Sequence, residues 1–409
     1  MRVFEWNSGF ETGQGGVDTQ HRRRIGDDQP VNSPPSFPLP FALPFALLLV
    51  FGCAGGGSSP DAGSDASAVD AGMTDASVTD SAVDAAPPPY DGGFAPRLVG
   101  DVSHPLDDVL RLNQLQAEGT HNSYHIRPEV YGDDWDYTMS PLGVQLADEG
   151  VRQIELDLHW DRLGHRWHVF HIGVADPLST CDLFLDCLAE VRRFSDSHPG
   201  HHPIFIQIEP KEPFRASEIQ EEMDAMEAEI ELVLPPELLI TPDIVRGASP
   251  DLKTAIADHG WPTLGEVRGR VLFFLNCSRE WCVSYAHDGE GLDGRLIFAD
   301  SEASDPWAAF RIINTPGPDV RVAAEAGYLV RTMAVSASDA LAGNFGDFDL
   351  ALRSGAHMIS GDVPAPRDGI SFFAEIPGGT PSRCNPITAP PECTSTDLED
   401  PARWVPSAP

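Results

Sequence analysis

Basic residues are scarce in this sequence. Lysine and arginine together number 27 against 63 aspartates and glutamates, so the 409-residue chain carries a formal net charge of −36. Such a charge argues against nucleic-acid binding and against a broad electrostatic attachment to anionic membranes. Part of the acidity comes from residues 60–86, where aspartate recurs among alanine, serine and glycine without one basic residue. That composition cannot bury enough apolar surface to fold, so we expect a disordered spacer.

The apolar run FALPFALLLVFGC at residues 41–53 is too short to span a bilayer. Its length is typical of the core of a secretory signal. It ends at Cys53 in a pattern that resembles a bacterial lipobox, which favours a lipid-anchored lipoprotein over an unprocessed N-terminal anchor. The basic cluster at residues 21–24 lies further upstream than a compact signal peptide would place it, so we expect the first thirty or so residues to precede the true start.

Zinc-type cysteine spacings are absent. Apart from Cys53, the cysteines fall into three pairs that are close in sequence: Cys181 and Cys187, Cys277 and Cys282, Cys384 and Cys393. Fifteen connectivities are possible, and nearest-neighbour disulfides in an oxidising compartment are our prediction. The composition becomes globular near residue 98. We therefore expect a signal-bearing segment at 1–53, a disordered spacer at 54–97, a folded domain at 98–375 and a Pro-rich tail at 376–409.

Short strand-like runs alternate with helical ones in the folded part, which predicts an α/β fold with parallel strands. Eight candidates favour an irregular (β/α)8 TIM-type barrel. Helix is predicted most clearly at residues 217–234 and 339–354, the latter ended by Gly355. The candidate strands are residues 113–118, 153–159, 167–171, 204–209, 271–276, 296–299, 328–333 and 357–360.

Polar side chains interrupt two of these strands with a period of two. In Ile154-Glu155-Leu156-Asp157-Leu158-His159, the polar residues share one face, and Gln207, Glu209 and Lys211 do the same on a later strand. A buried parallel strand is normally apolar on both faces, so inward carboxylates must be paired, protonated or metal-bound. The alternative for the first strand is a salt bridge to Arg152 or Arg166.

Two histidines accompany these carboxylates at strand ends, where barrel chemistry takes place. His121 and Asn122 follow the first strand, and His171 ends the third. Asn122, Glu155, Asp157 and Glu209 offer only hard oxygen ligands, which suit Ca²⁺ or Mg²⁺ rather than zinc. The aromatic residues Tyr124, Tyr131, Trp135 and Tyr137 follow the first strand and either form an interfacial lip or pack in loops.

The motifs GTHNSY, IELD, VFHIG and IQIEPK occur in an order that resembles phosphatidylinositol-specific phospholipase C, calcium-dependent secreted bacterial branch. The resemblance covers about residues 106–365 and takes in GWPTLGEVRGRVLFFL, YLVRTMA and HMISGDVP. It implies that residues 98–375 are a catalytic barrel with catalytic His121 and His171 and a Ca²⁺ site of Asn122, Glu155, Asp157 and Glu209. Lys211 and Arg331 are candidates for binding the phosphate or the inositol; a structural pair of Arg331 with Asp362 or Glu209 is the alternative.

The implied reaction is cleavage of phosphatidylinositol, at a membrane surface, into diacylglycerol and inositol 1,2-cyclic phosphate. The expected protein is a monomeric, exported bacterial lipoprotein of the cell envelope or extracellular space. One rival is a glycerophosphodiester phosphodiesterase, which shares the acidic strand but opens with His-Arg-Gly, where this chain has His121-Asn122-Ser123. Another is a catalytically silent surface-binding lipoprotein, although binding alone does not need both histidines and carboxylates.

Overall fold

The computed structural model describes residues 90–91, 93–367, 373–378 and 381–406. Cys53, the lipobox-like segment and the spacer up to residue 89 lie outside these residues. No helix within them is both long and apolar enough to cross a membrane. Upstream of residue 98, the backbone N–H of Tyr90 donates to Asp186 Oδ1 (2.5 Å) and Arg97 forms an ion pair with Asp196, so the folded part begins before the predicted boundary.

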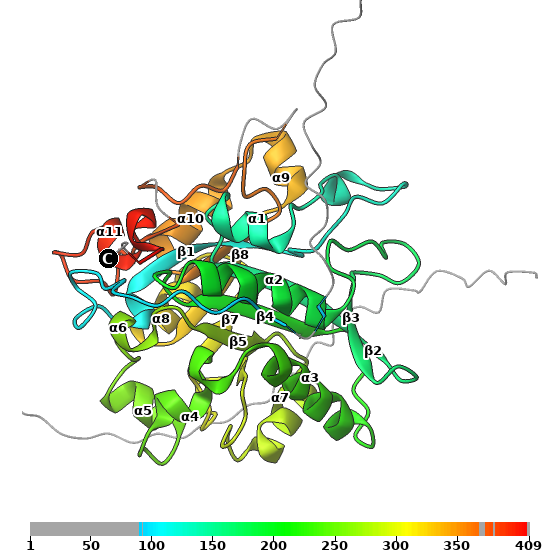
Figure 1. Ribbon diagram of the computed structural model, residues 1–409, viewed down its shortest axis with the longest axis horizontal. Helices are drawn as coiled ribbons and strands as arrows, with labels where there is room; N and C mark the ends of the chain where they lie inside the picture. Colours follow the sequence, from blue (N-terminus) through cyan, green and yellow to red (C-terminus); the bar gives the residue numbers. More distant parts are fainter. Residues whose placement is uncertain (1–89, 92, 368–372, 379–380, 407–409) are drawn as a thin grey trace, which may run out of the picture. The chain divides into compact units, whose positions relative to one another are not determined.

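Parallel strands form an almost closed barrel, as predicted (Figure 1). They run in the order β6-β5-β4-β2-β1-β9-β8-β7, and a single parallel bridge between Asp300 and Phe310 connects the two ends. The rings of Phe274 and Phe310 stack 4.1 Å apart inside the barrel. The barrel strands are β1 (Leu115–Thr120), β2 (Gln153–Asp161), β4 (Ile204–Pro210), β5 (Val271–Leu275), β6 (Phe298–Ala299), β7 (Phe310–Ile312), β8 (Leu329–Val335) and β9 (Met358–Gly361).

The predicted third strand belongs to a hairpin rather than to the barrel. β3 (Arg166–Val169) pairs antiparallel with β2 around the turn at residues 162–165, where His165 has a positive φ of 47°. The strand that completes the barrel is β7, which the sequence prediction missed because three residues are too few to show an alternating pattern. The predicted number of eight barrel strands was therefore right, but one of the eight predicted strands lies outside the barrel.

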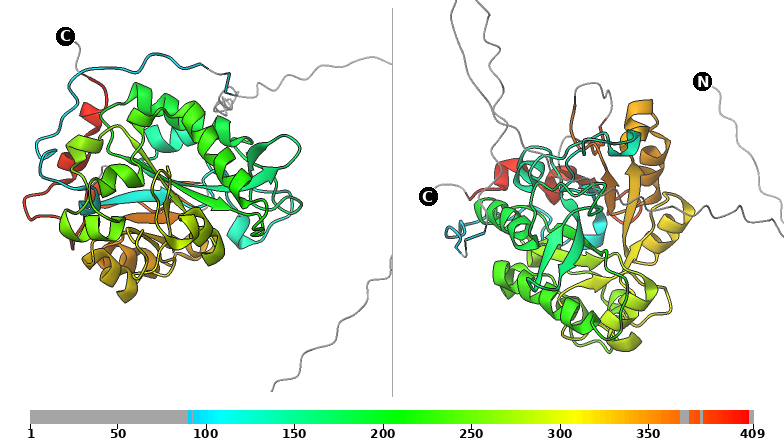
Figure 2. Two further views of the ribbon diagram at one scale, coloured as in Figure 1. Left: turned by 90° about the horizontal axis from the view of Figure 1, so that it is seen from below. Right: turned by 90° about the vertical axis from the view of Figure 1, so that its right-hand side faces the viewer.

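Helices cover the outside of the barrel (Figure 2). The predicted helix at residues 339–354 is two helices, because Gly343 adopts φ 67° and ends the first of them; Gly355 ends the second, as predicted. Residues 300–309 between β6 and β7 contain no helix. The helices are α1 (Leu142–Ala147), α2 (Phe184–Ser197), α3 (Ile219–Val233), α4 (Pro242–Arg246), α5 (Leu252–Asp258), α6 (Leu264–Val267), α7 (Arg279–Tyr285), α8 (Pro318–Glu325), α9 (Ala337–Ala342), α10 (Gly346–Ser354) and α11 (Ser395–Leu398).

The C-terminal tail closes the end of the barrel where the strands begin. β10 (Ser382–Cys384) pairs antiparallel with the start of β1, and α11 follows it (Figure 1). Glu399 is fully buried and accepts hydrogen bonds from Arg152 Nε at 2.9 and 3.0 Å. His201 and His202 are buried at this end. The three nearest-neighbour disulfides are present, which confirms the predicted pairing.

Candidate active site at the carboxyl ends of the strands

Three carboxylates meet inside the barrel because β2 and β4 are neighbours in register. Asp157 lies opposite Glu209, and Glu155 lies two residues earlier on the same face of β2. One oxygen from each of the three lies within 4.8 Å of the others. Neither Arg152 nor Arg166 pairs with them: Arg152 binds Glu399 and Arg166 lies beside Asp161. The alternative of a salt bridge to these arginines is therefore excluded.

Asp157 is the most deeply buried member of the cluster. Neither of its oxygens has a hydrogen bond, and Oδ2 has only an ionic contact of 2.8 Å with Lys211 Nζ. Burial, reinforced by the charges of Glu209 and Glu155, raises the pKa of Asp157 to about 7 against the opposing effect of Lys211. A buried carboxylate without hydrogen bonds is an oxygen ligand available to a hard cation.

Asn122 lies beside this cluster in a loop that is tied to β2. Its backbone has φ 44°, a region that asparagine tolerates better than most residues. Ser123 fixes the loop: its N–H donates to the Glu155 carbonyl oxygen (3.1 Å), and its Oγ accepts from the Glu155 N–H (2.7 Å). Asn122 Oδ1 accepts a hydrogen bond from Tyr124 Oη at 3.2 Å. The four predicted ligands thus supply only oxygen donors from three adjacent strands, a set that fits calcium.

Lys211 and Arg331, predicted to contact substrate, pair with the carboxylates in this structure. Lys211 Nζ contacts Asp157 and Glu209. Arg331 is almost fully buried and donates to Glu155 Oε2 at 2.6 Å, rather than to Asp362 or Glu209. It also donates to Asn314 Oδ1 (2.6 Å) and to Ser360 Oγ (3.0 Å). The positive charges therefore balance the acidic cluster.

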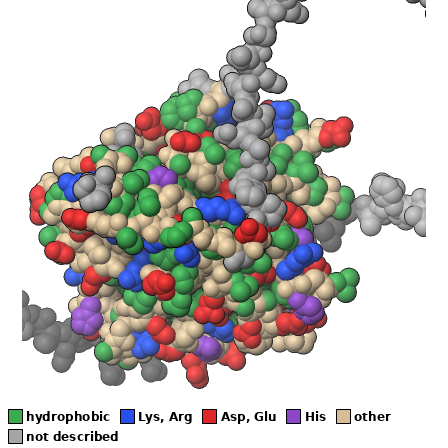
Figure 3. Space-filling model, in the orientation of Figure 1, with side chains coloured by type: hydrophobic (Ala, Val, Ile, Leu, Met, Phe, Trp, Pro, Cys, Tyr) green, Lys and Arg blue, Asp and Glu red, His purple; other side chains and the backbone are tan. Residues whose placement is uncertain are grey.

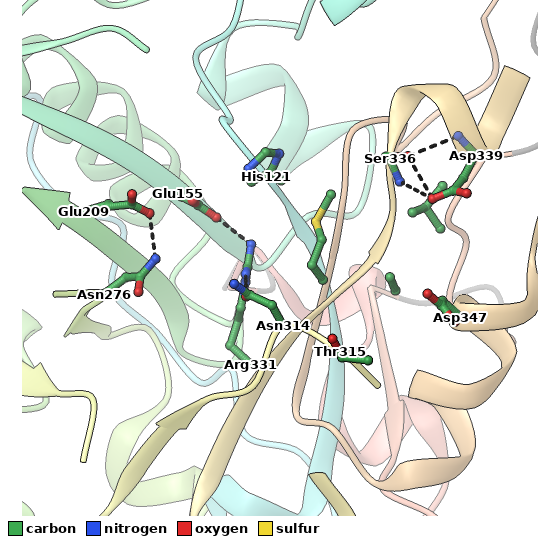
Figure 4. A pocket seen from close by; sticks show the side chains of 13 residues that line it. His121, Glu155, Glu209, Asn276, Asn314, Thr315, Arg331, Ser336, Asp339 and Asp347 are labelled. Atoms are coloured by element: carbon green, nitrogen blue, oxygen red, sulfur yellow. Dashed lines mark hydrogen bonds and ion pairs between the residues drawn. The ribbon is translucent and has the colours of Figure 1, made fainter. Parts of the chain in front are cut away.

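His121 follows β1 and projects over the same cluster (Figure 4). Its Nδ1 lies 2.8 Å from Asp362 Oδ1, and the other Asp362 oxygen accepts from the Ala337 N–H. Burial lowers the pKa of His121, but the charges of Glu155 and Asp362 outweigh it and raise the pKa to about 9. Asp362 therefore fixes the ring of His121, a role that the sequence did not indicate.

His171 lies in the loop after β3, outside the set of residues that line the cavity. Its Nδ1 is 2.9 Å from Asp176 Oδ2, and the edge of the Trp135 ring faces it at a centroid distance of 5.7 Å. The side chain is 22% exposed. The structure therefore brings His121 into contact with the acidic cluster and holds His171 in a separate, adjacent group.

A cavity of about 250 Å³ opens beside the cluster (Figure 4). One end holds His121, Glu155 and Glu209, and the other holds Asp339 and Asp347. The prediction missed two amide side chains in its wall. Asn276 follows β5 and donates to Glu209 Oε2 (2.6 Å), and a polar residue after an apolar strand could have revealed it. Asn314 follows β7, the strand that the sequence did not show.

A comparison with models of protein families matches residues 166–386 to Phosphoinositide phospholipase C, Ca2+-dependent. The match covers more than half of the chain. This chain belongs to that family. It is therefore a calcium-dependent phospholipase C, a phosphoric diester hydrolase. The matched segment contains His171, Glu209, Lys211 and Arg331 and begins downstream of the other predicted site residues.

The solved structures to which this chain is similar are distant in sequence. A calcium-dependent phosphatidylinositol-specific phospholipase C from Streptomyces antibioticus is 19% identical, with 62% of this chain and 95% of that chain covered and a TM-score of 0.47. A calcium-dependent enzyme from a Gram-negative Pseudomonas species is 18% identical, with 70% and 100% covered and a TM-score of 0.48. Comparison with curated proteins found no match.

Proposed function

We propose that this phospholipase C cleaves phosphatidylinositol into diacylglycerol and inositol 1,2-cyclic phosphate. One observation carries the proposal: one oxygen from each of three carboxylates lies within 4.8 Å of the others, and two of the three, Glu155 and Glu209, line a cavity together with His121. Asn122, Glu155, Asp157 and Glu209 would hold calcium. Bound there, calcium makes the inositol 2-hydroxyl more acidic and offsets the negative charge that grows on the phosphate.

Two different side chains then carry out the two proton transfers of the reaction. The 2-hydroxyl oxygen forms a bond to phosphorus while the bond from phosphorus to the diacylglycerol oxygen breaks, and the tether between nucleophile and phosphate favours this closure. His121, with Nδ1 held by Asp362, presents Nε2 to the phosphate. The charge of Glu155 helps to raise the pKa of His121, and bound calcium would offset that charge, so that the ring would be neutral in the loaded enzyme and take the hydroxyl proton; Glu155 or Glu209 is the alternative base. His171 gives a proton to the departing diacylglycerol oxygen.

The acidic far end of the cavity favours a headgroup without additional phosphates. Asp339 and Asp347 line that end with Ser336 and Thr315, and the cationic lining residue Arg331 is already paired with Glu155. Hydroxyl groups of inositol can donate to these carboxylates, whereas a further phosphate would be repelled. We therefore expect phosphatidylinositol to be cleaved faster than phosphatidylinositol 4,5-bisphosphate in the same mixed micelles.

Phosphorus NMR of phosphatidylinositol digestion, with and without calcium, tests the reaction. A cyclic phosphodiester signal that requires calcium supports the proposal. A parallel digestion of glycerophosphoinositol separates the rival: free glycerol 3-phosphate as the main product would identify a glycerophosphodiester phosphodiesterase. Cleavage of no phosphodiester in either digestion would favour a binding protein instead.

Exposed apolar side chains at one end of the barrel suit contact with a lipid surface. They lie on three loops that project from the side where the barrel strands end (Figure 1), and hydrophobic side chains reach the surface on that side (Figure 3). Leu163 at the tip of the β2–β3 hairpin is 95% exposed and Val174 in the next loop 97%. Val130 and Tyr131 occupy the loop after β1. Of the predicted aromatic lip, Tyr124 and Tyr137 are instead buried.

We infer that these loops insert apolar side chains into the membrane, because the net charge of −36 opposes adsorption to anionic lipid. Val174→Asp should weaken binding to phosphatidylinositol-containing vesicles and leave hydrolysis of a water-soluble inositol phosphodiester unchanged. Val322→Asp, at another exposed valine on α8 (65% exposed), is the matched control. Equal vesicle binding by both variants would contradict this surface.

We propose further that Cys53 carries a lipid anchor. The lipobox-like sequence before it supports this proposal, and the three disulfides agree with export to an oxidising compartment. Mass spectrometry of the protein from bacterial membranes should find a lipidated N-terminal Cys53, and Cys53→Ser should release the protein from the membrane fraction. An unmodified Cys53 in membrane-bound protein would contradict the anchor.

A further inference from the structure

A buried carboxylate joins two histidines behind the entrance. Asp176 Oδ2 lies 2.9 Å from His171 Nδ1 and 3.0 Å from His125 Nε2. The side chains of Asp176 and His125 are fully buried, whereas His171 is partly exposed. The other oxygen of Asp176 is buried without a hydrogen bond. The reaction proposed above uses His171 but assigns no role to Asp176 or His125.

The backbone fixes this group rigidly. Residues 172–176 form a tight turn in which the N–H of Ile172 donates to the Asp176 carbonyl oxygen (3.0 Å) and the N–H of Asp176 donates back (2.8 Å). His125 is held by a bridge to Ser179 and by stacking on Tyr137 at 4.2 Å. The turn thus brings the side chain of Asp176 back to the side chain of His171, which lies five residues earlier in the sequence.

The ring of His125 is placed between two hydrogen-bond acceptors. Its Nδ1 lies 3.0 Å from the Tyr137 carbonyl oxygen, and its Nε2 faces Asp176 in an ionic contact without hydrogen-bond geometry. A neutral imidazole has one N–H and can donate to only one of these neighbours, whereas a charged ring can donate to both. Burial lowers the pKa of His125 overall, and Asp176 offsets only part of that effect. The ring faces the Asp176 carboxylate at 3.0 Å in either form.

Few other titratable groups face the cluster. His159 Nε2 lies 3.3 Å from the His171 carbonyl oxygen, and the charge of Asp362 acts on His125. Trp135 and Tyr137 supply the remaining ring contacts. Among the described residues, Asp176 is the sole carboxylate within ion-pair distance of His171.

We propose that Asp176 and His125 are positioning residues for the reaction. Asp176 accepts the Nδ1–H of His171, which leaves Nε2 as the nitrogen that exchanges a proton with the diacylglycerol oxygen. His125 holds Asp176 in that position from the buried side. The inference rests on the proposed catalytic role of His171 and adds the group that sets its tautomer.

The calcium-loaded enzyme and the variants His171→Ala, Asp176→Asn, His125→Gln and Asp182→Asn test this proposal. Asp182 is the matched control because it is an exposed aspartate of the same loop. Asp176→Asn should lower kcat on phosphatidylinositol about 10- to 100-fold with KM unchanged, as loss of an orienting partner does elsewhere. Asp176→Asn should also shift the pH–rate profile, because a carboxylate beside an imidazole stabilises the charged form of the ring. His125→Gln should reduce kcat less.

Nitrogen NMR of the histidine rings provides a second readout that does not depend on activity. Wild-type His171 should be the Nδ1–H tautomer, and Asp176→Asn should shift it toward a mixture; an Nε2–H tautomer in the wild type would overturn the proposal even if the variant does not fold. Full activity of His171→Ala would instead refute the proposed function. An inactive His171→Ala beside an Asp176→Asn variant with wild-type kcat and pH profile would overturn only this inference.

Discussion

Replacing Glu399 with glutamine should destabilise the barrel more than any surface change of the same kind. Glu399 is fully buried, both of its oxygens accept from Arg152, and Oε2 also accepts from the His202 N–H at 3.0 Å. The variant leaves the Arg152 guanidinium buried without a counter-charge. Removing one partner of a buried ion pair costs about 3–5 kcal/mol.

Urea unfolding at pH 7 measures this loss. The exposed pair Arg321–Glu325 provides the control, because both side chains are about half exposed and Glu325→Gln should cost roughly 0.5 kcal/mol or less. A difference between the two variants below about 1 kcal/mol would show that the buried pair contributes little beyond its surroundings, and the reasoning would be wrong.

Lowering the pH should destabilise the buried group around Glu399 and Arg152, and its histidines should be the first to respond. Burial lowers the pKa of His202 from 6.5 to about 4 and that of His201 to about 3. In the unfolded chain these histidines bind protons near pH 6.5, whereas in the folded chain they stay neutral at that pH. The stability of the folded state therefore falls as the pH drops from 6.5 toward 4. Burial raises the pKa of Glu399, but Arg152 outweighs it and lowers that pKa to about 2, so this carboxylate contributes until still lower pH. Unfolding curves at pH 7, 5.5 and 4.5 should show the first loss.

Other perturbations act at the active site. His171→Ala should lower kcat on phosphatidylinositol by about 10²- to 10⁴-fold, the usual contribution of a general acid, while calcium binding measured by calorimetry persists; a variant of normal activity would remove this acid from the mechanism. Chelation of calcium should abolish cleavage and leave the circular dichroism unchanged; cleavage that persists would remove the metal from the mechanism. Asn276→Ala should weaken calcium binding about 10-fold or more, because Glu209 loses its 2.6 Å hydrogen bond; an unchanged affinity would contradict this.

Alternation along the strands predicted much of the site. Glu155, Asp157 and Glu209 share the barrel interior because the period of two assigns them to one face and parallel strands place their ends together. The same alternation placed Lys211 on this face, but the sequence could not show which charges meet Lys211 and Arg331, since register between distant strands decides the pairs. Arg331 reaches Glu155 across 176 residues of sequence.

Short elements and side-chain partners escaped prediction. β7 has only three residues, which leaves no periodicity to read. The hairpin after β2 could have been anticipated from Gly164, because a turn between two apolar runs that close in sequence favours antiparallel pairing. Asp362 and Asp176, which hold the two histidines, depend on loop conformations that no local pattern specifies.

The tail that closes the barrel also affects the order in which the chain can fold. β1 is the first barrel strand, yet it pairs with β9 and with β10, and Arg152 needs Glu399, 247 residues later. Contacts so distant in sequence form slowly and only after synthesis of the C-terminal segment. The barrel can therefore be completed only after the C-terminal segment has been synthesised. For the export proposed above, this delay favours passage across the membrane before folding.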